Sequence, residues 1–117
     1  MQHLLHVDQN ENKLIKDMEV AVIQENNKAS VKISGRLDTT TTPQFQEAIK
    51  PLIDGETTKI EIDCSGMDYT SSLGLRSFLL LQKSMSSKGG SMVLTGMQAK
   101  VREVFDITGF SSIIKIV

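Results

Sequence analysis

Three consecutive hydroxyl side chains, Thr70, Ser71 and Ser72, precede a segment with the apolar density of a helix. A serine at a helix N-cap accepts a hydrogen bond from a backbone N–H that has no partner inside the helix. The same position accommodates a phosphate, because the first turn offers free N–H donors and the positive end of the helix dipole. Either Ser71 or Ser72 is the expected N-cap. On residue type and spacing alone, Ser72 is a capping residue or a phosphorylation site, and capping is the commoner reason for a serine there.

Cys64 is the other nucleophile near this segment, but no histidine follows His6 to act as its base. The hydrolase pattern GxSxG and the phosphate-binding patterns GxxxxGK[ST] and GxGxxG are absent. His3 and His6 lack a carboxylate or thiolate at ligand spacing. We therefore expect a protein that is not an enzyme, with no catalytic residue, no metal site and no cofactor.

Composition indicates one ordinary globular domain. The 117 residues suffice for a single core, and a net charge of −1 argues against a nucleic-acid partner. No apolar run approaches the ~20 residues of a membrane-spanning helix, and no secretory signal is seen, so we expect a cytoplasmic protein without a membrane partner. The single cysteine excludes an internal disulfide and fits a reducing compartment.

Periodicity and turn residues predict strands that alternate with helices after a polar, weakly patterned segment of residues 1–17. Such an order favours a mixed or parallel sheet covered on one face by helices. The expected elements are a hairpin of residues 19–24 and 29–34, a helix from Pro43 to Leu52, a strand from Lys59 to Asp63, a turn-rich loop from Cys64 to Thr70, a helix from Ser72 to Ser87, a strand from Met92 to Leu94, a helix from Val101 to Thr108 and a closing strand from Ile113 to Ile116.

Three ordered motifs resemble a known family, the anti-sigma factor antagonists, whose fold is the STAS domain. They are Ile33-Ser34-Gly35-Arg36-Leu37-Asp38, then Asp63 to Leu75 with Ser71-Ser72-Leu73-Gly74-Leu75, then Lys88 to Phe110. The resemblance implies an α/β fold, a STAS-type single domain over residues 18–117 with a mixed sheet of four to five strands covered on one face by three or more helices. Residues 1–17 would be an N-terminal extension, disordered or artefactual.

Alignment on Gly74-Leu75 places the family's phosphorylated serine at Ser72, with Ser71 as a secondary candidate. The resemblance implies a non-enzymatic partner-switching regulator. Unphosphorylated, it binds an anti-sigma factor that is a serine kinase of the GHKL type; phosphorylation of Ser72 releases it, and a PP2C-type phosphatase reverses the modification. The residues expected at the partner interface are Asp38, Thr39, Asp68, Thr70, Ser71, Leu73, Gly74 and Arg76.

Simpler interpretations remain for several of these residues. Asp38 could form only an Asx turn, Asp68 could be a solvated loop charge, and Arg76 could be an ordinary exposed arginine. An alternative function is a STAS-fold soluble subunit of a lipid or anion transport system, although such a subunit needs no phosphorylatable serine. A small hydrolase or nucleotide-binding enzyme is disfavoured, because the base and the phosphate loop are missing.

Overall fold

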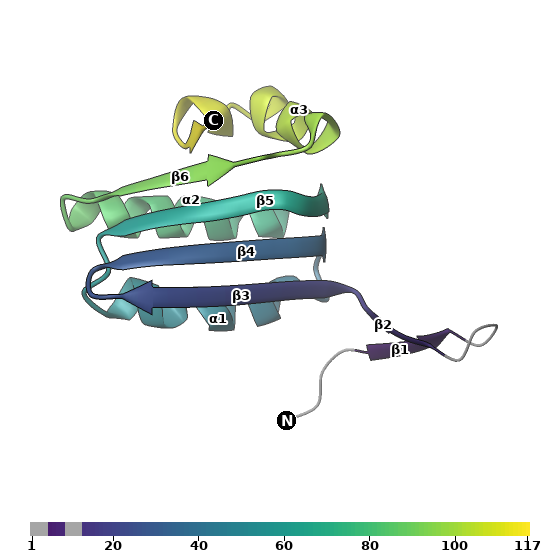
Figure 1. Ribbon diagram of the computed structural model, residues 1–117. Coiled ribbons are helices and arrows are strands. Elements are labelled where there is room, and N and C mark those ends of the chain that lie inside the picture. The colour runs from purple at the N-terminus through teal and green to yellow at the C-terminus, as the bar shows by residue number, and fades with distance from the viewer. Residues whose placement is uncertain (1–4, 9–12) are drawn as a thin grey trace.

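A five-stranded mixed sheet forms the centre of the computed structural model, which describes residues 5–8 and 13–117 (Figure 1). The strand order is β3-β4-β5-β6-β7. Strand β3 pairs with β4 in antiparallel fashion, and the remaining neighbours are parallel. The strands are β3 (Met18–Glu25), β4 (Lys28–Leu37), β5 (Lys59–Thr70), β6 (Ser91–Thr95) and β7 (Lys115–Ile116).

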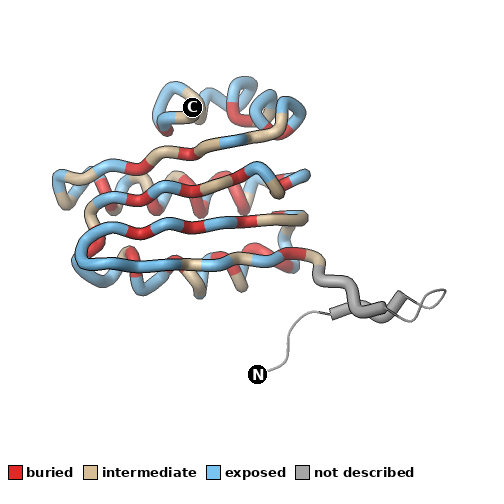
Figure 2. The backbone as a smooth tube through the Cα atoms, in the orientation of Figure 1, coloured by how far each residue is buried: buried red, intermediate tan, exposed pale blue. Residues whose placement is uncertain are grey.

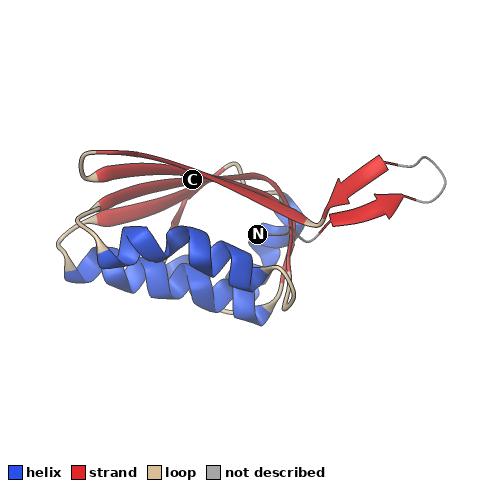
Figure 3. Ribbon diagram, turned by 90° about the horizontal axis from the view of Figure 1, so that it is seen from below, coloured by secondary structure: helices blue, strands red, loops and turns tan. Residues whose placement is uncertain are grey.

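Three α-helices complete the fold, namely α1 (Thr42–Asp54), α2 (Ser72–Ser87) and α3 (Ala99–Ile107). Figure 3 shows α1 and α2 side by side beneath one face of the sheet. The aromatic ring of Phe78 in α2 lies 5.3 Å from that of Phe45 in α1 and 5.7 Å from that of Phe105 in α3, measured between centroids. All three helices therefore share one core, and the predicted class of fold is confirmed.

Burial alternates along the central strands, as expected for a sheet covered on one side (Figure 2). In β4, Ala29, Val31 and Ile33 are buried, whereas the residues between them are exposed. The predicted hairpin is confirmed as β3 and β4, which pair from Met18↔Gly35 to Glu25↔Lys28. The predicted second helix is confirmed with the same bounds, Ser72–Ser87.

The predicted loop from Cys64 to Thr70 is wrong, because β5 continues through these residues to Thr70. Its second half pairs with the end of β4 as far as Leu37↔Thr70, with two irregularities in the register. Gly66 permits a close approach, since a Cβ there would lie 2.7 Å from that of Ser34. Backbone pairing with β4 therefore outweighs the turn propensity of the Ser65-Gly66 pair.

The predicted closing strand is shorter than expected. A short 3₁₀ turn, Phe110–Ser112, follows α3, and only Lys115–Ile116 pairs with β6. Ile113 stays outside the strand with 53% of its surface exposed. Near the N-terminus, β1 (Leu5–Asp8) and β2 (Lys13–Lys16) pair with each other in a separate two-stranded sheet, which the weak sequence pattern does not predict.

Lys88, the residue directly after α2, forms hydrogen bonds with the end of α1 and the residues that follow it. Its Nζ donates hydrogen bonds to the carbonyl oxygens of Leu52 and Gly55 at 2.9 Å and of Thr57 at 3.2 Å. These carbonyls lie in and just after the last turn of α1, where backbone acceptors lack helical partners and a cation is favoured.

In the described part of the chain, no helix is both long and apolar enough to cross a membrane.

Candidate functional site

The candidate site lies where β4 and β5 end next to each other. Because the two strands are parallel, their carboxyl ends meet at the same edge of the sheet. Leu37 and Thr70 are register partners there, and the Ser71 N–H donates a hydrogen bond of 2.9 Å to the Leu37 carbonyl oxygen. This pairing brings the loop that follows β4 beside the start of α2.

Ser71 is the N-cap of α2, and Ser72 is the first helical residue. The Ser71 backbone is extended, with φ −88° and ψ 173°, and its Oγ accepts a hydrogen bond of 3.3 Å from the Gly74 N–H. Ser71 is half-buried, whereas Ser72 is exposed. Within the described residues, the Ser72 hydroxyl makes no hydrogen bond. Ser71 is therefore the N-cap, which the sequence pattern alone does not decide, and Ser72 faces solvent.

Gly74 lets the first turn of α2 pack against the strand ends. A Cβ at this position would lie 2.5 Å from Thr70 Oγ1 and 2.8 Å from Leu37 Cδ2, both far inside ordinary contact distance. Gly74 and Thr70 are buried, and the Thr70 hydroxyl donates to the Ser71 carbonyl oxygen at 3.1 Å. Both are predicted to contact a partner; in the folded chain they pack inside this turn, and Thr70 keeps only 6% of its surface exposed.

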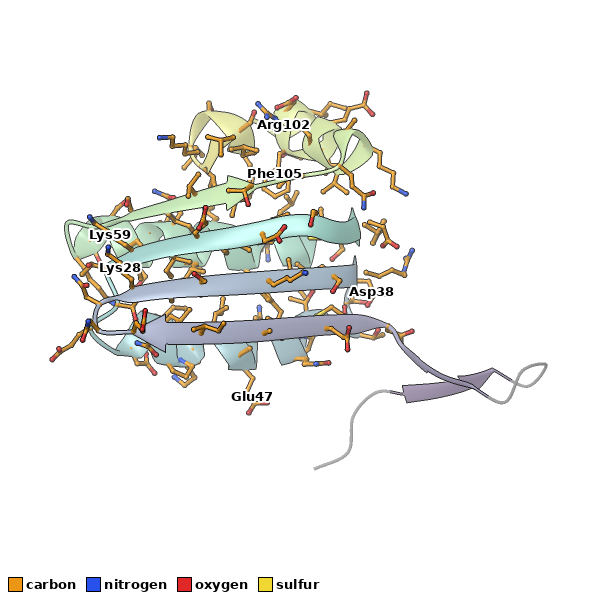
Figure 4. All side chains as sticks on the ribbon, in the orientation of Figure 1. Lys28, Asp38, Glu47, Lys59, Arg102 and Phe105 are labelled. Carbon is orange, nitrogen blue, oxygen red and sulfur yellow. The ribbon has the colours of Figure 1, made fainter. Side chains whose placement is uncertain are left out.

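Asp38 organises the loop that follows β4 and lies at the end of that strand in Figure 4. Its Oδ1 accepts hydrogen bonds from the Thr40 hydroxyl at 2.7 Å and from the Thr40 and Thr41 backbone N–H groups at 2.9 and 3.0 Å. The Asx turn is therefore present. The Thr40 hydroxyl, followed by the two backbone donors, lowers the pKa of Asp38 to about 2 despite some desolvation, so the carboxylate stays ionised at neutral pH.

Arg36 and Tyr69 lie within two of the sequence motifs but are not among the predicted interface residues, and they form a second part of the site. They are register partners on β4 and β5, and the Arg36 guanidinium carbon lies 4.2 Å from the centroid of the Tyr69 ring. Arg36 Nε also lies 3.5 Å from Asp38 Oδ2. In the sequence, the position of Arg36 two residues before Asp38 could have indicated that it belongs to the site. Its aromatic partner Tyr69 follows only from the register of the two strands.

The other predicted interface residues surround the start of α2. Thr39, Asp68 and Arg76 are exposed, and Leu73 is half-buried. Thr39 lies in the Asp38 loop, Asp68 lies near the end of β5, and Arg76 lies one helical turn beyond Ser72. The structure therefore gathers Asp38, Thr39, Asp68, Ser71, Ser72, Leu73 and Arg76 at one end of the sheet.

Two findings concern the Cys64 thiol and the metal-ligating residue types of the described chain. Cys64 is fully buried, and burial raises the pKa of its thiol to about 12, so it is not a thiolate nucleophile at neutral pH. Within the described residues, no group of three or more His, Cys, Asp and Glu side chains could hold a metal ion. His3 lies outside those residues.

A family model described as the STAS domain matches residues 18–117, and this chain belongs to that family, that of the anti-sigma factor antagonists. The anti-sigma-B factor antagonist of Bacillus subtilis is 31% identical over 100 residues, which cover 86% of this chain and 91% of the relative.

Two solved structures of SpoIIAA share the fold. The anti-sigma factor antagonist SpoIIAA in its unphosphorylated form has a TM-score of 0.73 and 19% identity, over 85% of this chain and 88% of that one. The Bacillus cell fate determinant SpoIIAA in the phosphorylated form has a TM-score of 0.67 and 18% identity, over 85% and 91%. At these identities the likeness shows the fold alone.

Proposed function

We propose that this chain is a partner-switching regulator that binds an anti-sigma factor when unphosphorylated and is released when Ser72 is phosphorylated. The partner would be a GHKL-type serine kinase, a PP2C-type phosphatase would remove the phosphate, and the switch would operate in the cytoplasm. Residues 18–117 would form the domain that carries this function, and residues 1–17 would be an extension. The chain itself catalyses no step in this scheme.

The observation that carries the proposal is the exposed, unbonded hydroxyl of Ser72 at the first position of α2. A kinase must reach a hydroxyl that has no structural task. Ser71, the secondary candidate, already uses its hydroxyl to cap the helix. Modification of Ser72 leaves this cap intact, and the helix dipole favours a negative group in the first turn. The fold itself therefore tolerates the phosphate.

A phosphate on Ser72 would change the charge of the proposed contact surface. It adds roughly 1.5 to 2 negative charges and three acceptor oxygens. The neighbouring Asp38 is already ionised. A partner that packs on Asp38, Thr39, Asp68, Ser71, Leu73 and Arg76 without phosphorylation would then have to desolvate two adjacent anionic groups. Because desolvating a charge costs more than a partly exposed ion pair returns, the complex dissociates.

The test is intact-mass spectrometry of the chain purified from its native host, with fragmentation across Met67 to Arg76. We expect one phosphate on Ser72 that is absent from Ser72→Ala and retained in Ser71→Ala, the matched control one residue away. Phosphate on Ser71 would keep the switch but move its site. An unmodified chain under all growth conditions would contradict the proposal and favour a constitutive subunit of a lipid or anion transport system.

A further inference from the structure

The outer surface of the two long helices is hollowed between them. Helices α1 and α2 lie side by side (Figure 3), and two adjoining depressions of about 360 and 310 Å³ share Gln46, Ser77 and Leu80. The Gln46 amide donates to the Ser77 hydroxyl at 3.0 Å and joins the helices beneath. We call the two depressions together the α1–α2 groove.

The groove has an apolar floor at helical spacing. On α1, Ile49 and Ile53 lie four residues apart, and on α2, Leu73 and Leu80 lie seven apart. Leu80 keeps 54% of its surface exposed although it lies between two depressions. Stripes of this kind, one from each of two neighbouring helices, form the surface into which a third helix packs.

The charges of the groove are unbalanced. Arg76 and Lys83 line its α2 side, and α2 carries no acidic residue. On the α1 side, Lys50 already pairs with Asp54 at 2.8 Å. Among the described residues, neither Arg76 nor Lys83 has an ion-pair partner. The surface around Leu80 is therefore apolar with a positive rim along α2.

We propose that the α1–α2 groove binds an acidic amphipathic helix of the partner kinase, with apolar side chains over Leu80 and carboxylates against Arg76 and Lys83. This inference rests on the proposed function and specifies the surface of the partner. A second copy of this chain is a poor occupant, because its own groove presents the same positive rim. An anionic membrane is also disfavoured, since membrane-binding clusters usually contain about 4–8 basic residues.

The groove begins at the modification site, which links docking to the switch. Leu73 and Arg76 line its end nearest Ser72, and Arg76 lies four residues, one helical turn, beyond that serine. A phosphate on Ser72 would compete with the partner's carboxylates for Arg76 and repel the acidic helix. Phosphorylation therefore weakens binding in the α1–α2 groove as well as binding at the loop of Asp38.

The test measures phosphorylation of Ser72 by native-host extract and ATP, as initial rates over a range of concentrations of purified chain. We expect Leu80→Asp to raise KM at least about tenfold with an unchanged maximal rate, and Lys83→Glu to raise it severalfold. KM of the wild type should rise with salt. The matched controls, Ile23→Asp and Lys32→Glu, change exposed residues on the opposite face of the sheet and should behave as wild type.

Thermal unfolding of each variant shows that it is folded, and the outcomes then separate the two proposals. If Ser72 is phosphorylated and Leu80→Asp keeps the wild-type KM, or Ile23→Asp raises it equally, the groove is not the docking surface and only this inference fails. If wild-type chain is never phosphorylated, the proposed function fails and the inference with it. If the wild type, but not Lys83→Glu, sedimented with phosphatidylglycerol vesicles, the groove would bind an anionic membrane and the inferred protein partner would be wrong.

Discussion

Replacing Gly74 by alanine should weaken the junction between α2 and the ends of β4 and β5. In an exposed helix, alanine is more favourable than glycine by about 1 kcal/mol. At this position, however, the new Cβ would lie 2.5 Å from Thr70 Oγ1 and 2.8 Å from Leu37 Cδ2, where ordinary contacts begin at 3.4 Å. The first turn of α2 must therefore move by about 0.9 Å, or its neighbours must yield.

The size of the effect follows from these opposing terms. Forcing an extra carbon into a packed core typically destabilises by about 1–3 kcal/mol. Because the new Cβ would collide with two residues at once, the cost here lies in the upper part of that range, about 2–3 kcal/mol. After about 1 kcal/mol of helix propensity is subtracted, the free energy of unfolding should fall by about 1–2 kcal/mol. For a domain of this length that corresponds to a decrease in Tm of about 4–8 °C. Because the junction holds Ser72 in place, phosphorylation of Ser72 should also slow.

Urea denaturation followed by circular dichroism measures the free energy directly. Adding Thr70→Ala to the Gly74→Ala chain removes the closest contact, so the two substitutions should cost less together than the sum of their separate effects. Gly89→Asn is the matched control, since Gly89 has open space around it and a positive φ that asparagine tolerates. A Gly74→Ala chain as stable as the wild type, or more stable, would refute the packing role of this glycine.

Three further predictions concern Asp38, Lys88 and Cys64. The folded-state pKa of Asp38, about 2, lies below its ordinary value, so its carboxylate contributes stability above about pH 4 that is lost as the pH falls toward 2. Allowing for its partial exposure, Asp38→Asn should lower the free energy of unfolding by about 1 kcal/mol at neutral pH, and its urea midpoint should vary less than that of the wild type between pH 4 and 2. Lys88→Met should lower the free energy of unfolding by about 1–2 kcal/mol in the same assay, because three carbonyl oxygens lose a charged donor. Its control, Lys83→Met on the outer face of α2, should change the free energy of unfolding by less than about 0.5 kcal/mol. Cys64 should resist a thiol reagent at about pH 8 in the native protein and react fully in concentrated guanidinium; rapid native reaction would contradict its burial.

Sequence patterns predict the helices better than the strand ends. The run from Leu73 to Met85 has a helical apolar pattern bounded by serine and Lys88-Gly89-Gly90, and α2 ends where those signals place it. The strand β5 differs because Ser65 and Gly66 are turn formers by composition. Their backbone instead pairs with β4, a partner that is distant in sequence, and no local pattern contains that information.

In the candidate site, too, local sequence signals predict some features, and others depend on tertiary contacts. The types and spacing of the hydroxyl residues point to the start of α2, but whether Ser71 or Ser72 caps it depends on a backbone conformation that spacing does not determine. Thr70 and Gly74 are buried in the turn, and strand register places Arg36 and Tyr69 beside Asp38. Each of these facts depends on tertiary contacts between β4 and β5. The modification of Ser72 and the contacts with a partner remain predictions.

The hydrogen bond between the Ser71 N–H and the Leu37 carbonyl oxygen joins two segments separated by the whole of α1 and the whole of β5. Parallel pairing of this kind is intrinsically slow to form, because the entropy of closing the intervening loop is lost before the contacts compensate for it. A newly synthesised or damaged chain would present Ser72 without Asp38 beside it. Under the proposed function, a kinase that recognises both residues would therefore leave unfolded copies unmodified, and only folded molecules would take part in the switch.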